Sequence, residues 1–236
     1  MTAPDELHVV TVEQNSIRLG RQVVHDPASR RYAFQAGEAP RRDIQLRVYG
    51  PTPRPNQTIG CCTGVDQCVK ANTAGNRVAG HVLRMVDAER IYSNATKLDP
   101  WPGEYPPADT GSSGLAACKA AQALGLVDRY EWLFGGTDDI LAALAAGKPV
   151  GVGTWWLRSM WNVDPATGLI EVGGPRDGGH QWTVTGYSKR FDAFRGECWW
   201  GESFGIAGRF LIRRADLAQL LADDGDAHVS YRRLAL

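Results

Sequence analysis

The first part of the chain has little apolar periodicity. Residues 1–55 are rich in Arg, Asp and Pro, and this composition predicts an extended arm that lies over the rest of the protein. Within the arm, alternating apolar and polar residues at 44–49 predict one short strand. We therefore expect residues 1–55 to form an N-terminal extended arm and residues 56–236 to form the folded domain.

Helical patterns follow the arm. Apolar residues recur at helical spacing just after residue 61 and again at 78–86, where they share one helical face. An Ala-rich stretch at 114–124 predicts a third helix. A fourth is predicted at 137–147, with a threonine N-cap and two aspartates in its first turn. The helical half of the domain is expected at about 56–147.

The last part of the chain is expected to consist mainly of strands. Candidate strands are residues 150–157, 181–187, 194–200, 208–213 and 227–232, with one short helix at 215–221. Helices that come first and strands that come second favour an α+β protein with segregated layers over alternating βαβ units. The strand-rich half is expected at about 148–236.

Composition narrows the class of protein. The 236 residues contain 26 Lys+Arg and 26 Asp+Glu, and this balance argues against a nucleic-acid binder. The sequence contains no run of 18 apolar residues, so no membrane-spanning helix is expected. The first 25 residues lack the pattern of a secretory signal. The five cysteines, an odd number, favour free thiols over a disulfide framework.

A first group of chemically interesting residues is Gln57 with the adjacent Cys61 and Cys62. A thiol at the start of a predicted helix lies near unpaired backbone N–H groups, which stabilise a thiolate. A cysteine nucleophile requires such a lowered pKa. The alternative is a buried cysteine that acts as a small apolar residue.

A second group is Gly178, Gly179 and His180. A histidine that opens a predicted strand after two glycines is held on a rigid element, and the glycines allow another chain to approach closely. The alternative is a structural histidine with satisfied ring nitrogens. The other four histidines are less well placed for chemistry.

A third group is the segment 198–210, in which glycines and aromatic residues predict a tight strand–turn–strand. A hydrophobic hairpin explains it equally well. No pattern of closely spaced Cys or His predicts a metal site, and no glycine-rich phosphate-binding motif occurs, so we expect neither a metal nor another cofactor.

Taken in order, these groups resemble the papain-like cysteine peptidases of bacteria and phages. In that family a Gln precedes the nucleophile, the His opens a later strand, and a block ending in Ser-Trp-Gly follows. The corresponding residues are Gln57, Cys62, His180 and the Cys-Trp-Trp-Gly segment that starts at Cys198. The segments 19–27, 109–114 and 221–226 are also similar to the bacterial and phage branch.

The resemblance implies roles for individual residues. Cys62 would be the nucleophile and His180 the general base and acid. The Gln57 amide and the backbone N–H of Cys62 would form the oxyanion hole. The residues expected to line the substrate site are Ser113, Gly114, Gly179 and Trp200. Trp200 would also shield the hydrogen-bond partner of His180 from water.

Two departures from the family pattern matter. The residue before the nucleophile is Cys61, which leaves open which thiol attacks; the spacing from Gln57 favours Cys62. The Asn that normally orients the His is replaced by Cys198, a weak hydrogen-bond acceptor. Glu197 could in principle replace this Asn, but its position in the strand is expected to point its side chain to the opposite face.

The two cysteines also suggest control by oxidation. A disulfide between Cys62 and Cys198 would block the site, if the two Cα atoms lie within about 7 Å.

Three functions follow from the resemblance. The first is a thiol peptidase acting on peptide or protein substrates in the bacterial cytoplasm. The second is a catalytically impaired papain-like module in a phage virion or tail, or at a cell surface, with other virion proteins as partners. The tryptophans at 155, 156 and 161 would form its contact surface; the alternative is that they fill the strand-rich core. The third is an acyl transferase or amidase acting on cell-wall peptide.

Overall fold

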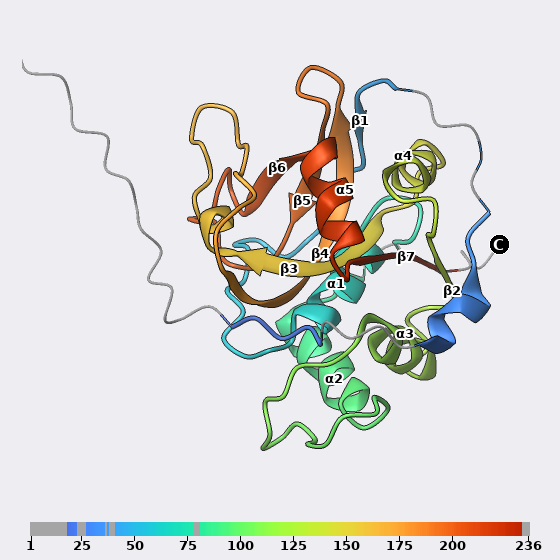
Figure 1. Cartoon of the computed structure of the whole chain (residues 1–236). Helices are drawn as coiled ribbons and strands as arrows, with labels where there is room; N and C mark the ends of the chain where they lie inside the picture. The colour runs from blue at the N-terminus through green and yellow to red at the C-terminus, as the bar shows by residue number, and fades with distance from the viewer. Residues whose placement is uncertain (1–17, 23–26, 36, 38–40, 78–80, 233–236) are drawn as a thin grey trace, which may run out of the picture.

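The computed structural model describes residues 18–22, 27–35, 37, 41–77 and 81–232. Within these ranges, five α-helices surround one antiparallel sheet (Figure 1). The helices are α1 (Cys62–Ala71), α2 (Met85–Ala95), α3 (Gly114–Ala123), α4 (Thr137–Ala145) and α5 (Arg214–Ala222). None of the described helices is long and apolar enough to cross a membrane.

The sheet has seven strands and is antiparallel throughout. The strands are β1 (Ile44–Gln45), β2 (Arg129–Trp132), β3 (Val150–Leu157), β4 (Arg176–Ser188), β5 (Ala193–Glu197), β6 (Arg209–Arg213) and β7 (Asp226–Tyr231). Their order is β2-β7-β3-β4-β5-β6, and β1 also pairs with β4. Strand β3 therefore lies between β7 and β4, and its register sets Thr154 opposite His180.

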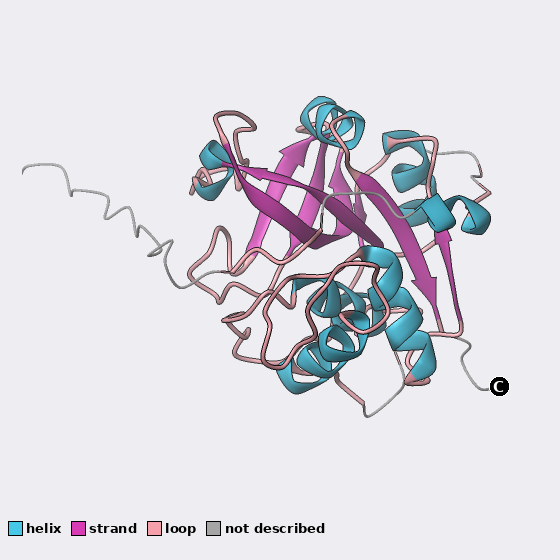
Figure 2. Ribbon diagram, turned by 60° about the horizontal axis from the view of Figure 1, so that its bottom comes forward, coloured by secondary structure: helices cyan, strands magenta, loops and turns pink. Residues whose placement is uncertain are grey.

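The helices α1, α2 and α3 pack together on one side of the sheet, where they enclose their own apolar cluster (Figure 2). All of α1 is buried, because it also packs against β3, β4 and β7. A second apolar cluster lies among the strands with α4 and α5. The expected α+β class, a central buried helix packed on an antiparallel sheet, is confirmed.

Local sequence explains where the helices begin. The side chain of Ser113 caps α3 by accepting a hydrogen bond from the backbone N–H of Ala116 at 3.1 Å. In α2, the Asp87 carboxylate accepts the backbone N–H of Arg84 at 2.7 Å, which fixes the first turn. The helix predicted at 78–86 is therefore wrong in its start: residues 81–84 are not helical, and 78–80 lie outside the described residues.

The predicted strands agree with the sheet in most places. Strand β3 spans the predicted residues, whereas β4 begins at Arg176, so that His180 lies inside the strand and does not open it. Strand β2 was not predicted and falls within the expected helical half. Two 3-10 helices, η2 (Pro27–Tyr32) and η3 (Arg158–Trp161), were also not predicted. The division into an arm and two halves stays a prediction.

The tryptophans that were weighed as a contact surface are largely internal. Trp156 is fully buried and lies edge-on to Trp161 and Trp200, with ring centroids 5.7 and 5.0 Å away. Trp155 and Trp161 are half-buried. The hypothesis of an aromatic contact surface is therefore wrong for Trp156, which fills the core beside His180.

Candidate active site

Cys62 is the first residue of α1 and is fully buried. Burial raises the pKa of its thiol to about 11, although backbone N–H groups of Gln181 and Gly20 and the charge of Arg21 act in the opposite direction. Cys62 thus lies against the residue that follows His180 and against the N-terminal segment. The thiol is neutral at pH 7 in this arrangement.

The neighbouring Cys61 faces a different environment. Its Sγ lies 3.9 Å from the Sδ of Met85, inside the cluster that α1 shares with α2, and burial raises its pKa far above the ordinary value. Cys62, by contrast, is close to backbone groups of β4 and of residue 20. The surroundings of the two thiols therefore favour Cys62 over Cys61 as a nucleophile.

His180 is held by aromatic rings. The Trp200 ring stacks on the imidazole with centroids 4.2 Å apart, and the Trp156 ring lies edge-on at 5.4 Å. Among the described residues neither ring nitrogen has a hydrogen-bond partner. Burial lowers the pKa of His180 to about 3, against the weak opposing effect of Asp66, so the imidazole is neutral.

Cys198 lies just after β5 and is buried, with its pKa raised well above the ordinary value by burial. It makes no hydrogen bond to the His180 ring. Cys62 and Cys198 are both free thiols, and a disulfide between them stays a prediction. Glu197 pairs with Arg54 and Arg209 and so is committed elsewhere.

Gln57 is buried directly before the Cys61–Cys62 turn. Its side-chain Nε2 donates a hydrogen bond to the backbone carbonyl of Arg18 at 2.8 Å. The turn itself is braced by Asp109, which accepts the backbone N–H of Gly60 at 2.9 Å and the hydroxyl of Tyr92 at 2.7 Å. The amide expected to bind an oxyanion is therefore rigidly placed, and it holds a carbonyl of the chain itself.

Residues 18–22 run between the start of α3 and strand β4. The Ser112 N–H donates to the Gly20 carbonyl at 2.8 Å, and the Gln22 N–H donates to the Ser112 carbonyl at 3.0 Å. On the other side, the Arg21 N–H donates to the Gly179 carbonyl at 3.0 Å. The segment pairs parallel to Ser112 and covers Cys62.

Gly20 is the point of closest approach. A Cβ at this position would overlap the backbone of Gly60, including its carbonyl oxygen. Only a residue without a side chain fits between the segment and the turn that carries Cys62. Leu19, the preceding residue, lies over Gly178.

The remaining predicted residues have these positions. Ser113 caps α3, and the backbone pairing with the arm occurs one residue earlier, at Ser112. Gly114 packs against the side chains of His228 and Gln181. Gly179 offers its carbonyl to the arm, and Trp200 covers the imidazole. The structure thus brings Gln57, Cys62, Gly179 and the arm into one region.

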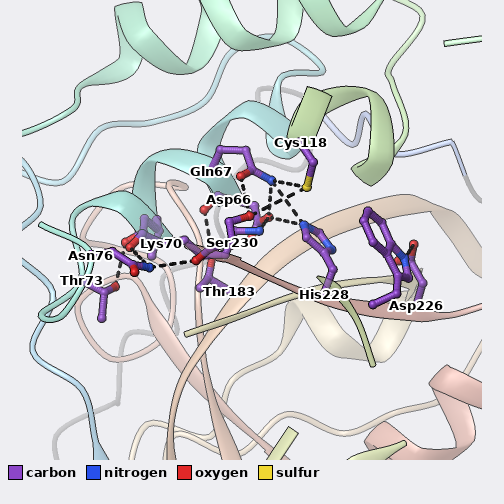
Figure 3. A network of polar contacts seen from close by, with 12 residues as sticks. Asp66, Gln67, Lys70, Thr73, Asn76, Cys118, Thr183, Asp226, His228 and Ser230 are labelled. Carbon is purple, nitrogen blue, oxygen red and sulfur yellow. Dashed lines mark hydrogen bonds and ion pairs between the residues drawn. The ribbon is translucent and has the colours of Figure 1, made fainter. Parts of the chain in front are cut away.

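A buried polar network around Asp66, further along α1 than Cys62, was not predicted from the sequence (Figure 3). Asp66 on α1 accepts from Lys70 at 2.8 Å and lies 3.3 Å from the Nε2 of His228 on β7. Gln67 contacts His228 and donates to the sulfur of Cys118 at 3.3 Å. The i, i+4 spacing of Asp66 and Lys70 was the one local signal, whereas the partners on α3 and β7 are distant in sequence.

Comparison with known proteins bears on the fold of the chain. Neither the protein-family models nor the curated proteins give a match to the chain. Among solved structures, xylellain, a cysteine protease from Xylella fastidiosa, superposes with a TM-score of 0.70 at 16% identity, covering 95% of this chain and 100% of xylellain. A procathepsin L 3 of Tenebrio molitor gives 0.61 at 11% identity, covering 93% and 75%. A procathepsin B from Trypanosoma congolense gives 0.58 at 13% identity, covering 94% and 85%. The chain therefore has the fold of the papain-like cysteine proteases.

Proposed function

We propose that this chain is a cysteine peptidase with Cys62 as nucleophile and His180 as general base and acid. The observation that carries the proposal is the position of the Cys62 thiol, at the N-terminus of α1 and against the backbone of Gln181, within a papain fold. The solved structures that resemble the chain are cysteine proteases, which supports the reaction class.

The reaction uses four groups of the site. The Cys62 thiolate attacks the carbonyl carbon of a peptide bond, and the negative oxygen that forms accepts hydrogen bonds from the Gln57 amide and the Cys62 backbone N–H. His180, protonated by the thiol, gives its proton to the leaving amine as the C–N bond breaks. A water molecule deprotonated by His180 then hydrolyses the thioester and regenerates the thiol.

The chain as described is a latent form of this enzyme. Residues 18–22 occupy the backbone positions at Ser112 and Gly179 and the amide of Gln57. The segment runs parallel to Ser112, lies over Cys62, and hydrogen-bonds to Gly179, the residue before His180. Displacement of the segment rehydrates both groups, which moves their pKa values towards each other and favours the thiolate–imidazolium pair.

A labelling experiment tests the proposal. The full chain is treated with a peptide that carries a thiol-reactive electrophile, and the labelled cysteine is mapped. We expect label on Cys62, none on that residue in Cys62→Ser, and retained label in the matched variant Cys61→Ser. His180→Ala should slow the reaction by at least about 100-fold, as loss of a general base does. Equal labelling of wild type and His180→Ala would contradict the proposal.

A second candidate function is a papain-like binding module with little turnover. The observation in its favour is the Cys198 substitution together with an imidazole that lacks any hydrogen-bond partner among the described residues. A place in a phage virion, with virion proteins as partners, rests on the resemblance of the sequence alone. Peptide binding without release of product, measured on the same variants, distinguishes this module from the peptidase.

A further inference from the structure

The side chain of Arg21 is buried in a way that is unusual for arginine. It is 2% exposed, and its Nη2 lies 2.9 Å from the Oδ1 of Asp226, which is 11% exposed. Long cationic side chains are almost never buried unless they are paired. Arg21 belongs to the segment that covers Cys62, so this ion pair lies beside the proposed reaction centre.

The slot that holds Arg21 is built by the sheet. Strand β3 carries Gly153, which the register sets opposite Asp226 on β7. A Cβ at Gly153 would overlap the Cδ and Nε of Arg21, so the missing side chain is what leaves room for the guanidinium. The Nε1 of Trp132 donates to the Oδ2 of Asp226 at 3.3 Å and fixes the direction of the carboxylate.

The carboxylate is suited to exchanging its partner. Asp226 also borders a cavity of about 620 Å³ that is lined by Trp132, Phe134 and Thr137, among others. When Arg21 leaves, water can reach the carboxylate from this side and hydrate the oxygen that the guanidinium has left. The Nε and Nη1 atoms of Arg21 have no hydrogen-bond partner among the described residues. The slot therefore interacts with the positive charge of Arg21 and does not provide an acceptor for each N–H group of the guanidinium.

The backbone that presents Arg21 occupies positions available to a substrate. It hydrogen-bonds to Ser112 on one side and to Gly179 on the other. Side chains alternate along an extended chain, so one residue points into the slot while its neighbours point away. Gly20 faces the Gly60 turn, and the Gln22 side chain reaches Thr110, at 2.5 Å.

We propose that the slot between Gly153 and Asp226 selects peptide substrates with an Arg or Lys side chain, and that Arg21 is an internal stand-in for that side chain. The inference rests on the proposed peptidase function and adds its substrate class. A peptide that displaces residues 18–22 replaces one ion pair with Asp226 by another. A peptide with an apolar residue there does not replace the ion pair that Arg21 makes with Asp226, and a peptide with an acidic residue is repelled by the carboxylate.

The test uses the full chain with Gly20→Ala and Arg21→Ala, which removes the close fit and the ion pair of the segment. The probes are tripeptide vinyl sulfones in which each residue in turn is Arg, Lys, Leu or Glu. At one position we expect Arg and Lys to label Cys62 on the order of 100-fold faster than Leu, as expected for a buried charge pair. Adding Asp226→Asn should bring that ratio close to one while labelling by the Leu peptide persists.

Two further variants keep the result interpretable if Asp226→Asn folds poorly. Gly153→Val fills the slot without changing its charge and should slow the basic peptides selectively. Asp223→Asn is the matched control, because Asp223 pairs with Arg176 at the surface, and it should leave the preference unchanged. Equal labelling of Cys62 by all peptides, or a preference that survives Asp226→Asn, would contradict the proposed selectivity of the slot and leave the peptidase function standing. Failure of every peptide, with iodoacetamide labelling of Cys62 unaffected by His180→Ala, overturns the peptidase function and the slot with it.

Discussion

The side-chain amide of Gln57 donates its hydrogen bond to the backbone carbonyl of Arg18, at a distance of 2.8 Å. The donor proposed for a substrate oxyanion is therefore engaged by the protein's own chain. The Gly20 backbone lies against Cys62, and the Gly179 carbonyl accepts from Arg21. Because one short segment takes all three positions, its displacement controls access to the site.

Replacing Gly20 with Ala should displace this segment. The new Cβ would overlap the Gly60 carbonyl, and Asp109 holds the Gly60 turn in place through the Gly60 N–H, so we expect the segment to move. We expect the rate of iodoacetamide labelling at Cys62 to rise at least about tenfold, measured by mass spectrometry at pH 7, because local opening exposes the thiol. Gly37→Ala is the matched control, since a Cβ there meets nothing within 4 Å. Equal rates in both variants would show that the segment does not limit access.

The pH dependence of labelling should differ between the two forms. In the wild-type chain burial raises the pKa of Cys62 to about 11, so the thiolate fraction, and with it the rate, should rise about tenfold per pH unit up to that value. In Gly20→Ala, water and a protonated His180 stabilise the thiolate, and substantial labelling should extend below pH 8. His180→Ala in the Gly20→Ala chain should restore a profile that rises only near the ordinary thiol pKa. Parallel profiles in all three proteins would rule out a working Cys–His pair.

The sequence was most informative where local pattern decides structure. Strand β3 and helix α3 follow from β-branched, aromatic and Ala-rich stretches, and their predicted bounds agree closely with the structure. The start of α2 was misjudged, because the apolar period at 78–86 continues across Arg84 while the Asp87 carboxylate fixes the first turn beyond it. Period indicates a helical face, and capping decides where the helix begins.

The relationships within the site are mostly tertiary. Arg21 and Asp226 are 205 positions apart, and the pair depends on the strand register that sets Gly153 opposite the carboxylate. Likewise, the contact between the arm and Gln57 joins residues 39 positions apart through a backbone carbonyl, which carries no sequence signal. The resemblance to a family pointed to the elements that carry Gln57, Cys62 and His180. It contained no information about what fills the space between them.

One cysteine outside the site should ionise before the others. The lowered pKa of Cys118 reflects the charges of His228 and Lys70, which outweigh its burial, whereas the other four thiols all have raised pKa values. A titration followed by thiolate absorbance near 240 nm should show a single thiolate forming below pH 9 and the rest above it. Cys118→Ala should abolish that first step, and Cys61→Ser should not. A first step that survives Cys118→Ala would show that another thiol ionises first.

Cys118 and His228 together also affect how the free energy of unfolding depends on pH. Burial opposes the charge on His228, but Cys118 and Asp66 raise its pKa to about 9, so its contribution is fully present below pH 6.5 and is lost as the pH rises through 9. The contribution of Cys118 has the opposite sign, because it is present above the unfolded thiol pKa and is lost as the pH falls through the folded value. Where the two windows overlap, below pH 9, the trends offset each other, so we expect the free energy of unfolding in urea to change less with pH there than His228 alone would cause. A steep slope in that interval, beyond the one seen in Cys118→Ala, would contradict the pairing.

Cys198→Asn should improve catalysis in the Gly20→Ala chain. Neither ring nitrogen of His180 has a hydrogen-bond partner among the described residues, and stacking on Trp200 restrains the plane of the imidazole without selecting its tautomer. The resemblance puts position 198 where an Asn orients the histidine, and an amide carbonyl there would accept a ring N–H and favour a single tautomer of His180. We expect kcat towards a peptide substrate to rise about tenfold or more with KM nearly unchanged, since a wrongly oriented His in the analogous serine triad costs up to about 10⁴. Cys198→Ala is the control that removes the thiol without adding an acceptor. If the Asn and Ala variants hydrolyse the peptide at the same rate, stacking alone orients His180, and the missing acceptor does not limit the proposed reaction.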